Sequence, residues 1–368
     1  MKILKKYNLL LFIPLLILNI ISLFNMLNAK LINYSYDKAF SKQLLWFILG
    51  YLIILILKKF KIKILFKYSL FLYIFSCLLL VLVLIFGNEI NGAKCWFNIF
   101  GFTFQPSELV KLTLILQLIN ILEKTKIKTL KDELLLIIKL FILTLIPSIL
   151  VFLEPDTGAI INYLIILIMV LFSTKLNKWW YISFMALSSF FIILFFIMYF
   201  FFQDFLINLI GTSLFYRMDR LINFANGTSY QLENALITIG AASFLGTGLN
   251  KILLYIPEAP TDFFLAFSIG NYGIFSALLI TLCYFIINLF LLFKAKKLNN
   301  KYFQVFIYSY LCMFIFHQIY NIFMNIGLLP IMGIPLPFLS YGGTNILINY
   351  LFLGIILNML NKRKSEII

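Results

Sequence analysis

The residues best able to do chemistry in this sequence are a few charged side chains set between long apolar stretches. Glu108 and Lys111 stand three residues apart, directly after Pro106. Proline suits the first turn of a helix, and residues three apart share one helix face, so the two side chains can form an ion pair. The pair has two interpretations: a structural link between helices, or part of a polar cavity in which Lys111 meets a phosphate.

The segment Glu-Pro-Asp-Thr-Gly at 154–158 lies at the junction of two apolar stretches. Pro155 breaks the chain there, and Asp156 has the short carboxylate that can cap the following helix. On spacing alone, a capping role explains Asp156. Charged groups at membrane depth are costly, however, so a functional role for this aspartate is the alternative.

A third polar cluster, 255–270, contains the acid best suited to catalysis. Pro257 and Pro260 prevent helix formation and Thr261 is a natural N-cap residue, so we expect Asp262 in the first turn of a long apolar helix. The helix N-terminus favours the carboxylate form, whereas desolvation favours the protonated acid. A carboxylate balanced in this way suits a general base, and a simple helix cap is the alternative.

The fourth cluster, 332–343, contains Pro335, Pro337 and two adjacent glycines in a stretch too apolar for a water-exposed loop. Irregular backbone at such a depth is tolerated where it lines a cavity or is buried in protein. Ser340 and Tyr341 supply hydroxyl groups there. A cavity wall and a packed re-entrant turn are both open interpretations.

The composition places these clusters in a membrane protein. Of the 368 residues, 63% are hydrophobic and 12% are charged, whereas soluble domains have about 45–50% and about 25%. The net charge of +16 comes from basic clusters between apolar stretches, which is typical of cytoplasmic loops at an anionic membrane face. The four cysteines lack CxxC spacing, and the one histidine, His317, is expected to be a core residue with a partner.

Hydropathy predicts an all-α integral membrane protein with ten transmembrane helices, because a span needs about 20 apolar residues. The candidate spans are 9–27, 44–57, 66–87, 106–122, 134–153, 158–173, 179–202, 262–293, 303–328 and 344–360. Most of the 30 Lys and Arg residues fall in segments that an inside N-terminus places in the cytoplasm, so both termini are expected to be cytoplasmic. Residues 1–368 then form a single polytopic membrane domain, whose first helix is not cleaved.

The largest segment outside the spans, 203–261, is expected to form a large outer loop between helices 7 and 8. Long loops on one face are where functional residues gather. Arg217 and Arg220 in this loop are suited to bidentate phosphate contacts, and equally to juxtamembrane surface charges.

In this order, the clusters resemble the SEDS family (shape, elongation, division and sporulation) of RodA/FtsW-type peptidoglycan polymerases. The resemblance covers nearly the whole chain. It rests on Gln-Pro-Ser-Glu-x-x-Lys at 105–111, Pro-Glu-x-x-Thr-Asp-Phe at 257–263 and Leu-Pro-Phe-x-Ser-Tyr-Gly-Gly at 336–343, together with segments 40–50, 154–158 and 230–240. The Gly-Ile-Pro-Leu-Pro form at 333–337 is more similar to RodA than to the division paralogue.

The resemblance implies a glycosyltransferase that polymerises lipid II at the outer face of the bacterial inner membrane. Asp262 matches the family's catalytic carboxylate, which would take the proton of the acceptor's C4 hydroxyl as it attacks the donor's anomeric carbon. The substrate-binding positions that the resemblance implies are Trp96, Glu108, Lys111, Asp156, Arg217, Gln231 and Ser340. Lys111 and Arg217 would stabilise the diphosphate that leaves.

The resemblance also sets expectations for cofactors and partners. A divalent cation, Mg²⁺ or Mn²⁺, is a candidate at the diphosphate, and no organic cofactor is expected. The expected partners are a class B penicillin-binding protein, which is a transpeptidase, and other membrane proteins of the elongation complex that sets cell shape; no nucleic acid is expected. The chain departs from the family at Gly270 and Asn271, which replace an acidic pair that could hold a metal.

Two other functions would use the same sequence features. A lipid-linked precursor flippase would need a polar path from both faces, whereas the polar clusters gather on the expected outer side, which favours an enzyme. A scaffold that only recruits cell-wall partners would not need Asp262 or Lys111. A division-type, FtsW-like polymerase is the alternative to an elongation role.

Overall fold

The computed structural model describes residues 2–90, 93–99, 102–174, 176–210, 230–249 and 251–361. The helices and their bounds are α1 (Lys2–Ala29), α2 (Ala39–Lys59), α3 (Ile62–Lys67), α4 (Ser69–Phe86), α5 (Pro106–Lys124), α6 (Leu130–Leu153), α7 (Thr157–Ser173), α8 (Lys178–Phe201), α9 (Gln203–Ile210), α11 (Tyr230–Ala241), α12 (Phe264–Lys296), α13 (Lys301–Asn325) and α14 (Gly343–Asn361). A 3₁₀ turn, η1 (Tyr34–Tyr36), follows α1, and three short strands lie between α4 and α5.

Each of the ten predicted spans is helical over most of its length. This is expected in lipid, where every backbone N–H and C=O group must be bonded within its own segment. Within the described ranges, seven helices are long and apolar enough to cross a bilayer, namely α1, α2, α4, α6, α12, α13 and α14. α7 is a shorter apolar helix, and α5 carries the polar side chains of the first cluster. The count of ten spans therefore stays a prediction.

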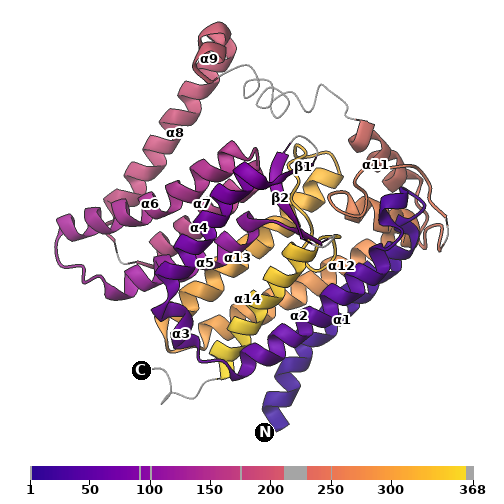
Figure 1. The fold of residues 1–368 in the computed structure, drawn as a ribbon, viewed down its shortest axis with the longest axis horizontal. Coiled ribbons are helices and arrows are strands. Elements are labelled where there is room, and N and C mark those ends of the chain that lie inside the picture. Colours follow the sequence, from indigo (N-terminus) through magenta and orange to yellow (C-terminus); the bar gives the residue numbers. More distant parts are fainter. Residues whose placement is uncertain are drawn as a thin grey trace.

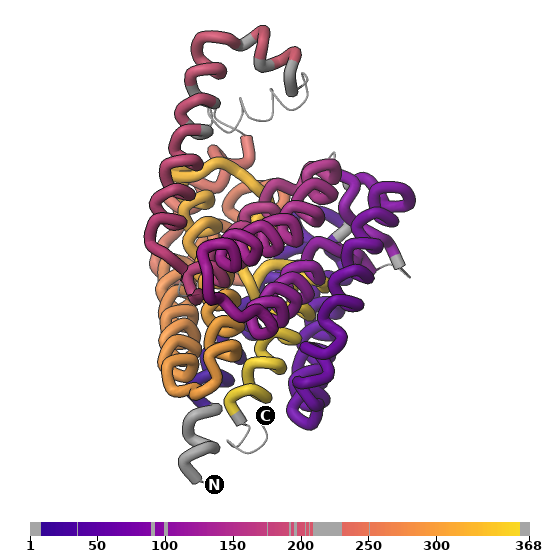
Figure 2. Tube along the Cα trace, turned by 90° about the vertical axis from the view of Figure 1, so that its left-hand side faces the viewer, coloured from indigo at the N-terminus to yellow at the C-terminus, as the bar shows by residue number. Residues whose placement is uncertain are grey.

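The start of α1 and the end of α14 lie on one side of the bundle, and the small sheet lies on the other (Figure 1). α1 begins and α14 ends at the lower edge of this view, which agrees with an even number of crossings. Their cytoplasmic location stays a prediction. At the opposite end, α8 rises beyond the bundle with α9 at its tip (Figures 1 and 2). Of the expected outer loop, residues 211–229 lie outside the described residues.

The segment between α4 and α5 corrects the all-α expectation. It contains a three-stranded antiparallel sheet of β1 (Asn88–Ile90), β2 (Ala93–Ile99) and β3 (Phe102–Phe104). Trp96 is paired with Asn88 across the first ladder. Such short strands are stabilised by pairs of side chains on neighbouring strands. The hydropathy of this segment therefore shows no helical period. The sheet matters for the site because β3 leads directly into α5.

Polar side chains spaced three residues apart on α1 join the central helices. The buried members of this row are Asn19, Ser22, Asn25 and Asn28. Ser22 Oγ donates to the Leu339 carbonyl, and Asn25 Nδ2 donates to Ser268 Oγ of α12. Lipid offers no hydrogen-bond partners, so these bonds fix α1 against α12 and against the segment that precedes α14.

Candidate active site

The turn that carries Asp262 lies directly before α12. The prediction that Thr261 caps the helix and that Asp262 occupies its first turn is wrong, because α12 begins at Phe264. The Glu258 carbonyl accepts the N–H groups of the three residues Thr261, Asp262 and Phe263 at 3.1, 3.0 and 3.2 Å. The two prolines of this segment thus favour a tight turn around one carbonyl, which delays the start of the helix.

Two asparagines of α13 hold this turn by its backbone. Asn321 Nδ2 and Asn325 Nδ2 donate to the Asp262 carbonyl oxygen at 2.8 and 3.2 Å, and both asparagines are buried. Asn325 Oδ1 also accepts the Ala266 N–H at 3.0 Å, which satisfies a backbone donor at the start of α12. The position of Asp262 is therefore set through its main chain.

The Asp262 carboxylate itself takes no part in the described bonds that hold the turn. It is partly exposed and accepts no hydrogen bond from the part of the chain that the structure describes. Gly333 lies beside it, since a Cβ atom there would be 3.8 Å from Asp262 Oδ2. Burial among apolar groups and, second, the charge of Glu258 raise the pKa of Asp262 to about 7. The group is thus close to half-ionised at neutral pH, which suits a proton acceptor.

Glu258 and its neighbours link the Pro-Glu-x-x-Thr-Asp-Phe motif to the Ser-Tyr-Gly-Gly motif. Its Oε2 accepts from Tyr36 Oη at 3.2 Å and from Thr261 Oγ1 at 3.0 Å. The Tyr341 N–H donates to the Pro260 carbonyl at 2.8 Å. The Tyr341 ring packs edge-on against Tyr36, with ring centroids 5.7 Å apart. The Ser-Tyr-Gly-Gly motif therefore lies against the Thr-Asp turn.

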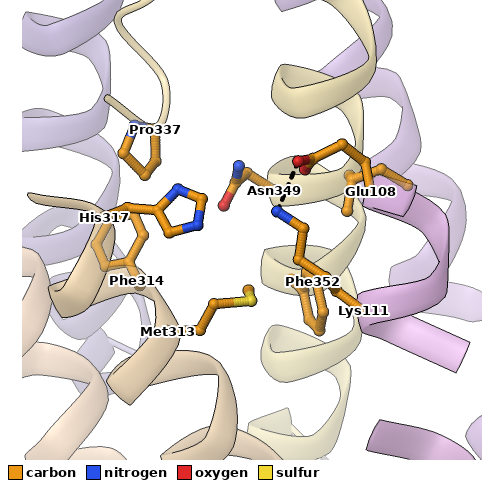
Figure 3. A pocket seen from close by; sticks show the side chains of 9 residues that line it. Glu108, Lys111, Met313, Phe314, His317, Pro337, Asn349 and Phe352 are labelled. Carbon is orange, nitrogen blue, oxygen red and sulfur yellow. Dashed lines mark ion pairs between the residues drawn. The ribbon is translucent and has the colours of Figure 1, made fainter. Parts of the chain in front are cut away.

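Glu108 and Lys111 form the ion pair that their spacing predicts. Lys111 Nζ lies 2.6 Å from Glu108 Oε1, and Asn345 Nδ2 of α14 donates to Glu108 Oε2 at 3.2 Å. The lysine side chain is 2% exposed. The pair borders a cavity of about 10 Å³ that it shares with His317 and Asn349 (Figure 3). A cavity of this size is close to the smallest that can hold one water molecule.

His317 on α13 faces this cavity from the side opposite the ion pair (Figure 3). Its Nε2 lies 2.9 Å from Asn162 Oδ1 of α7. Because Asn162 Nδ2 donates to the Gly158 carbonyl, Nε2 is assigned as the donor. The ring is buried, which confirms a core histidine with a partner. The sequence reasoning missed its place beside the ion pair, although His317, Asn321 and Asn325 recur every four residues and so share one helix face.

Asp156 caps α7 and joins it to the start of α5. Its Oδ1 accepts the Ala159 N–H at 3.1 Å, which confirms the predicted cap. Its Oδ2 accepts from Gln105 Nε2 at 2.8 Å and from Ser107 Oγ at 3.1 Å. These bonds bring the Gln-Pro-Ser-Glu motif against the Glu-Pro-Asp motif. A contact between Asp156 and substrate stays a prediction.

Glu154 is a buried acid whose state the sequence does not show. Its side chain is fully buried, and neither carboxylate oxygen has a hydrogen-bond partner among the described residues. Burial and, second, the charge of Asp156 raise the pKa of Glu154 to about 8, so the group is mostly protonated at neutral pH. Cys95 of β2 lies beside Glu154, and its Sγ–H donates to the Glu154 carbonyl at 3.0 Å. The raised pKa of Glu154 depends on this packing, which the local sequence pattern does not predict.

The other expected substrate contacts lie in different surroundings. Trp96 on β2 and Gln231 on α11 are half-buried. Ser340 is buried, and its hydroxyl accepts the Leu336 N–H at 2.9 Å, which closes the turn before α14. Arg217 lies outside the described residues. The substrate roles of these four residues stay predictions.

Asp262 and the Glu108–Lys111 pair are two separate centres. No hydrogen bond or ion pair joins them in the described chain. The irregular segment between α13 and α14 contacts both, since Gly333 lies beside Asp262 and Pro337 lines the cavity of the ion pair. This segment is therefore a common wall, as expected for irregular backbone that is enclosed by protein.

A divalent cation finds no complete site made of protein ligands. Across the residues that the structure describes, no group of three or more His, Cys, Asp or Glu side chains could hold a metal ion. Mg²⁺ is often bound by one or two carboxylates together with substrate phosphates, so its role stays a prediction. No step of the reaction below passes through a cation.

Comparison with known proteins identifies the family. A family model described as "Cell cycle protein", which groups FtsW, RodA and SpoVE, matches residues 2–365. The chain belongs to this family. The match confirms the SEDS resemblance seen in the motifs, and with the seven apolar helices it makes the chain a multi-pass inner membrane protein.

Individual relatives support the same family. Probable peptidoglycan glycosyltransferases FtsW from Thiomicrospira cyclica and Wigglesworthia glossinidia brevipalpis are each 31% identical to this chain over 289 residues. These matches cover 75% of this chain and 70% and 71% of those proteins.

Two solved structures have a similar fold. A chain from "Structural coordination of polymerization and crosslinking by a peptidoglycan synthase complex" has a TM-score of 0.78 at 23% identity, covering 96% of this chain and 98% of that one. The Rod shape determining protein RodA of Thermus thermophilus has a TM-score of 0.64 at 24% identity, covering 95% and 96%. At these identities the likeness shows a shared fold.

The buried ion pair generates a stability prediction. In Lys111→Met, the Glu108 carboxylate loses its counter-charge, and breaking a buried pair costs about 3–5 kcal/mol. We expect less extractable protein and a lower melting temperature in detergent. The double variant Lys111→Met/Glu108→Gln removes both charges and should recover most of the loss. Equal stability of the wild type and the single variant would show that the pair contributes nothing to folding.

Proposed function

We propose that this protein is a peptidoglycan glycosyltransferase that polymerises lipid II, with Asp262 as the general base. The observation that carries the proposal is a partly exposed Asp262 carboxylate that accepts no hydrogen bond from the described residues and has a pKa raised to about 7. Family membership and the names of the FtsW relatives support it. A scaffold would have no use for an acid whose backbone is fixed by two buried asparagines and whose carboxylate has no ion pair among the described residues.

In the proposed reaction, Asp262 accepts the proton of the acceptor's C4 hydroxyl. The oxygen then bonds to the anomeric carbon of the donor sugar, while the bond from that carbon to the lipid diphosphate breaks. The diphosphate leaves with the bonding electron pair, and an α-linked donor becomes a β-1,4 linkage. General-base assistance of this kind typically contributes about 10²–10⁴-fold in rate.

We assign Lys111 and Arg217 to charge stabilisation of the leaving diphosphate. Lys111 is buried against Glu108 beside a cavity of about 10 Å³, which is too small for a phosphate group. Lys111 would therefore act through movement of the ion pair or through the field of its charge. In the charge-neutral double variant described above, restored folding without restored polymerisation would support this role, whereas full polymerisation would contradict it.

We further propose that the protein works in cell elongation beside a class B penicillin-binding protein. The RodA-like form of residues 333–337 supports the elongation role, although the relatives described above carry the name FtsW. Similarity to a chain of a peptidoglycan synthase complex supports a partner of this kind. Expression in RodA-depleted and FtsW-depleted cells would separate the roles: rescue of rod shape supports elongation, and rescue of septation alone contradicts it.

Replacement of the base should abolish polymerisation. Asp262→Asn keeps the size of the side chain and the backbone bonds from α13, so folding should be retained while glycan strand synthesis from lipid II falls by at least about 100-fold. The exposed Asp37→Asn is the matched control and should stay active. Normal polymerisation by folded Asp262→Asn would refute the assignment.

The raised pKa predicts a pH profile with a defined sign. The base is active as a carboxylate, so polymerisation should rise with pH around a midpoint near the pKa of about 7 and be lost as pH falls below it. Glu258 raises this pKa by its charge, so Glu258→Gln should shift the midpoint to lower pH. The profile of lipid II polymerisation measures both effects. A midpoint that stays in place in Glu258→Gln would contradict the electrostatic account.

A further inference from the structure

α12 is interrupted at Gly273, where φ is 72° and ψ is −176°. These angles are not helical, so α12 consists of a short half, 264–272, and a long half, 274–296. An interrupted helix leaves backbone N–H and C=O groups without their usual partners, and lipid cannot supply them. The short half is the one that directly follows Asp262.

Residues 243–248, here called the bridging segment, bond to these backbone groups. The N–H groups of 247–248 donate to the carbonyls of 270–271 at 3.1 and 2.7 Å. In the other direction, the N–H groups of 274–275 donate to the carbonyls of 243–244 at 3.4 and 3.3 Å. The segment therefore closes the break in α12 from both sides.

Two glycines allow this close approach. A Cβ atom at Gly246, whose φ is +71°, would lie 2.5 Å from the Asn271 carbonyl oxygen, and a Cβ atom at Gly273 would overlap the Phe244 carbonyl. Both obstacles are backbone atoms, so no side-chain movement can relieve them. Asn271 is fixed as well, because its Nδ2 donates to Asn25 Oδ1 of α1 at 2.9 Å.

α11, which precedes the bridging segment, contacts the beginning of the short half of α12. Leu232 and Ala235 of α11 belong to one buried cluster with Phe263, Ala266 and Phe267. α11 leads directly into the bridging segment. One continuous stretch of chain thus contacts the short half of α12 at both of its ends.

We propose that the bridging segment is a positioning element of the active site. By closing the break in α12, it holds the short half and the preceding Asp262 turn in one orientation. This inference rests on the proposed function, since it gives the bridging segment its effect through Asp262. A displacement of about 1 Å at a reacting group can lower a rate by about 100-fold.

A disulfide tests the bridging contact in the full-length protein. The Phe244 and Phe275 rings are exposed, their centroids are 6.0 Å apart, and the Phe275 N–H donates to the Phe244 carbonyl. Phe244→Cys/Phe275→Cys should crosslink on oxidation in membranes and keep lipid II polymerisation. Each single variant, oxidised in the same way, controls for the four native cysteines. Failure to crosslink, or activity that disappears on crosslinking and returns on reduction, would overturn the proposal.

Two glycine-to-alanine substitutions, one in the bridging segment and one on α11, test the positioning effect. Gly246→Ala should lower kcat by about 100-fold with KM for lipid II unchanged, and should reduce crosslinking in the double-cysteine background. Gly240→Ala on α11 is the matched control, because no heavy atom lies within 4 Å of its Cβ position. An unchanged kcat per folded molecule in Gly246→Ala would show a purely structural role. Crosslinking needs no activity, so it is informative even if Asp262→Asn proves fully active and the proposed function fails.

Discussion

Two buried asparagines of α13 hold the turn that carries Asp262, and the proposed chemistry depends on this contact. Asn321 and Asn325 bind the Asp262 backbone carbonyl, while the side-chain carboxylate receives no hydrogen bond from the described chain. Had the carboxylate been the anchor, hydrogen bonds would have stabilised its charged form and lowered its pKa. Anchoring the main chain instead fixes the position of the acid and leaves its protonation to burial and to Glu258. A carboxylate with these properties is fixed in position and titrates near neutral pH.

The Glu108–Lys111 pair and Asp262 differ in whether their charge is neutralised by a neighbour. Lys111 and Glu108 neutralise each other in a buried pair, which is how a charge is usually tolerated in a low-dielectric interior. Among the described residues Asp262 has no counter-charge in contact, and Glu258 adds a like charge nearby. The irregular segment before α14 contacts both centres through Gly333 and Pro337. Movement of this segment would therefore affect Asp262 and Lys111 together.

Local features of the site could be predicted from sequence, whereas tertiary features could not. The Glu108–Lys111 pair and the Asp156 cap depend on spacings of three residues within one helix, so the pattern was sufficient. The start of α12 was placed two residues too early, because the turn depends on the Glu258 carbonyl and on α13. The strands of the β-sheet are too short to leave a clear periodic signal, and the buried state of Glu154 arises from contacts with distant segments such as β2. The motifs were sufficient to identify the family, whereas the pKa shifts of Asp262 and Glu154 depend on the folded structure.

The Asp262 carboxyl group accepts no hydrogen bond from the described residues, and its burial places its pKa at about 7. Infrared difference spectroscopy of the wild type against Asp262→Asn, recorded across a pH titration in membranes, measures the protonation of this one group. The account predicts a protonated carboxyl band that is lost with a midpoint near 7. A midpoint near 4, the ordinary value for an exposed aspartate, would contradict it, since the acid would then be solvated or hydrogen-bonded in its charged form.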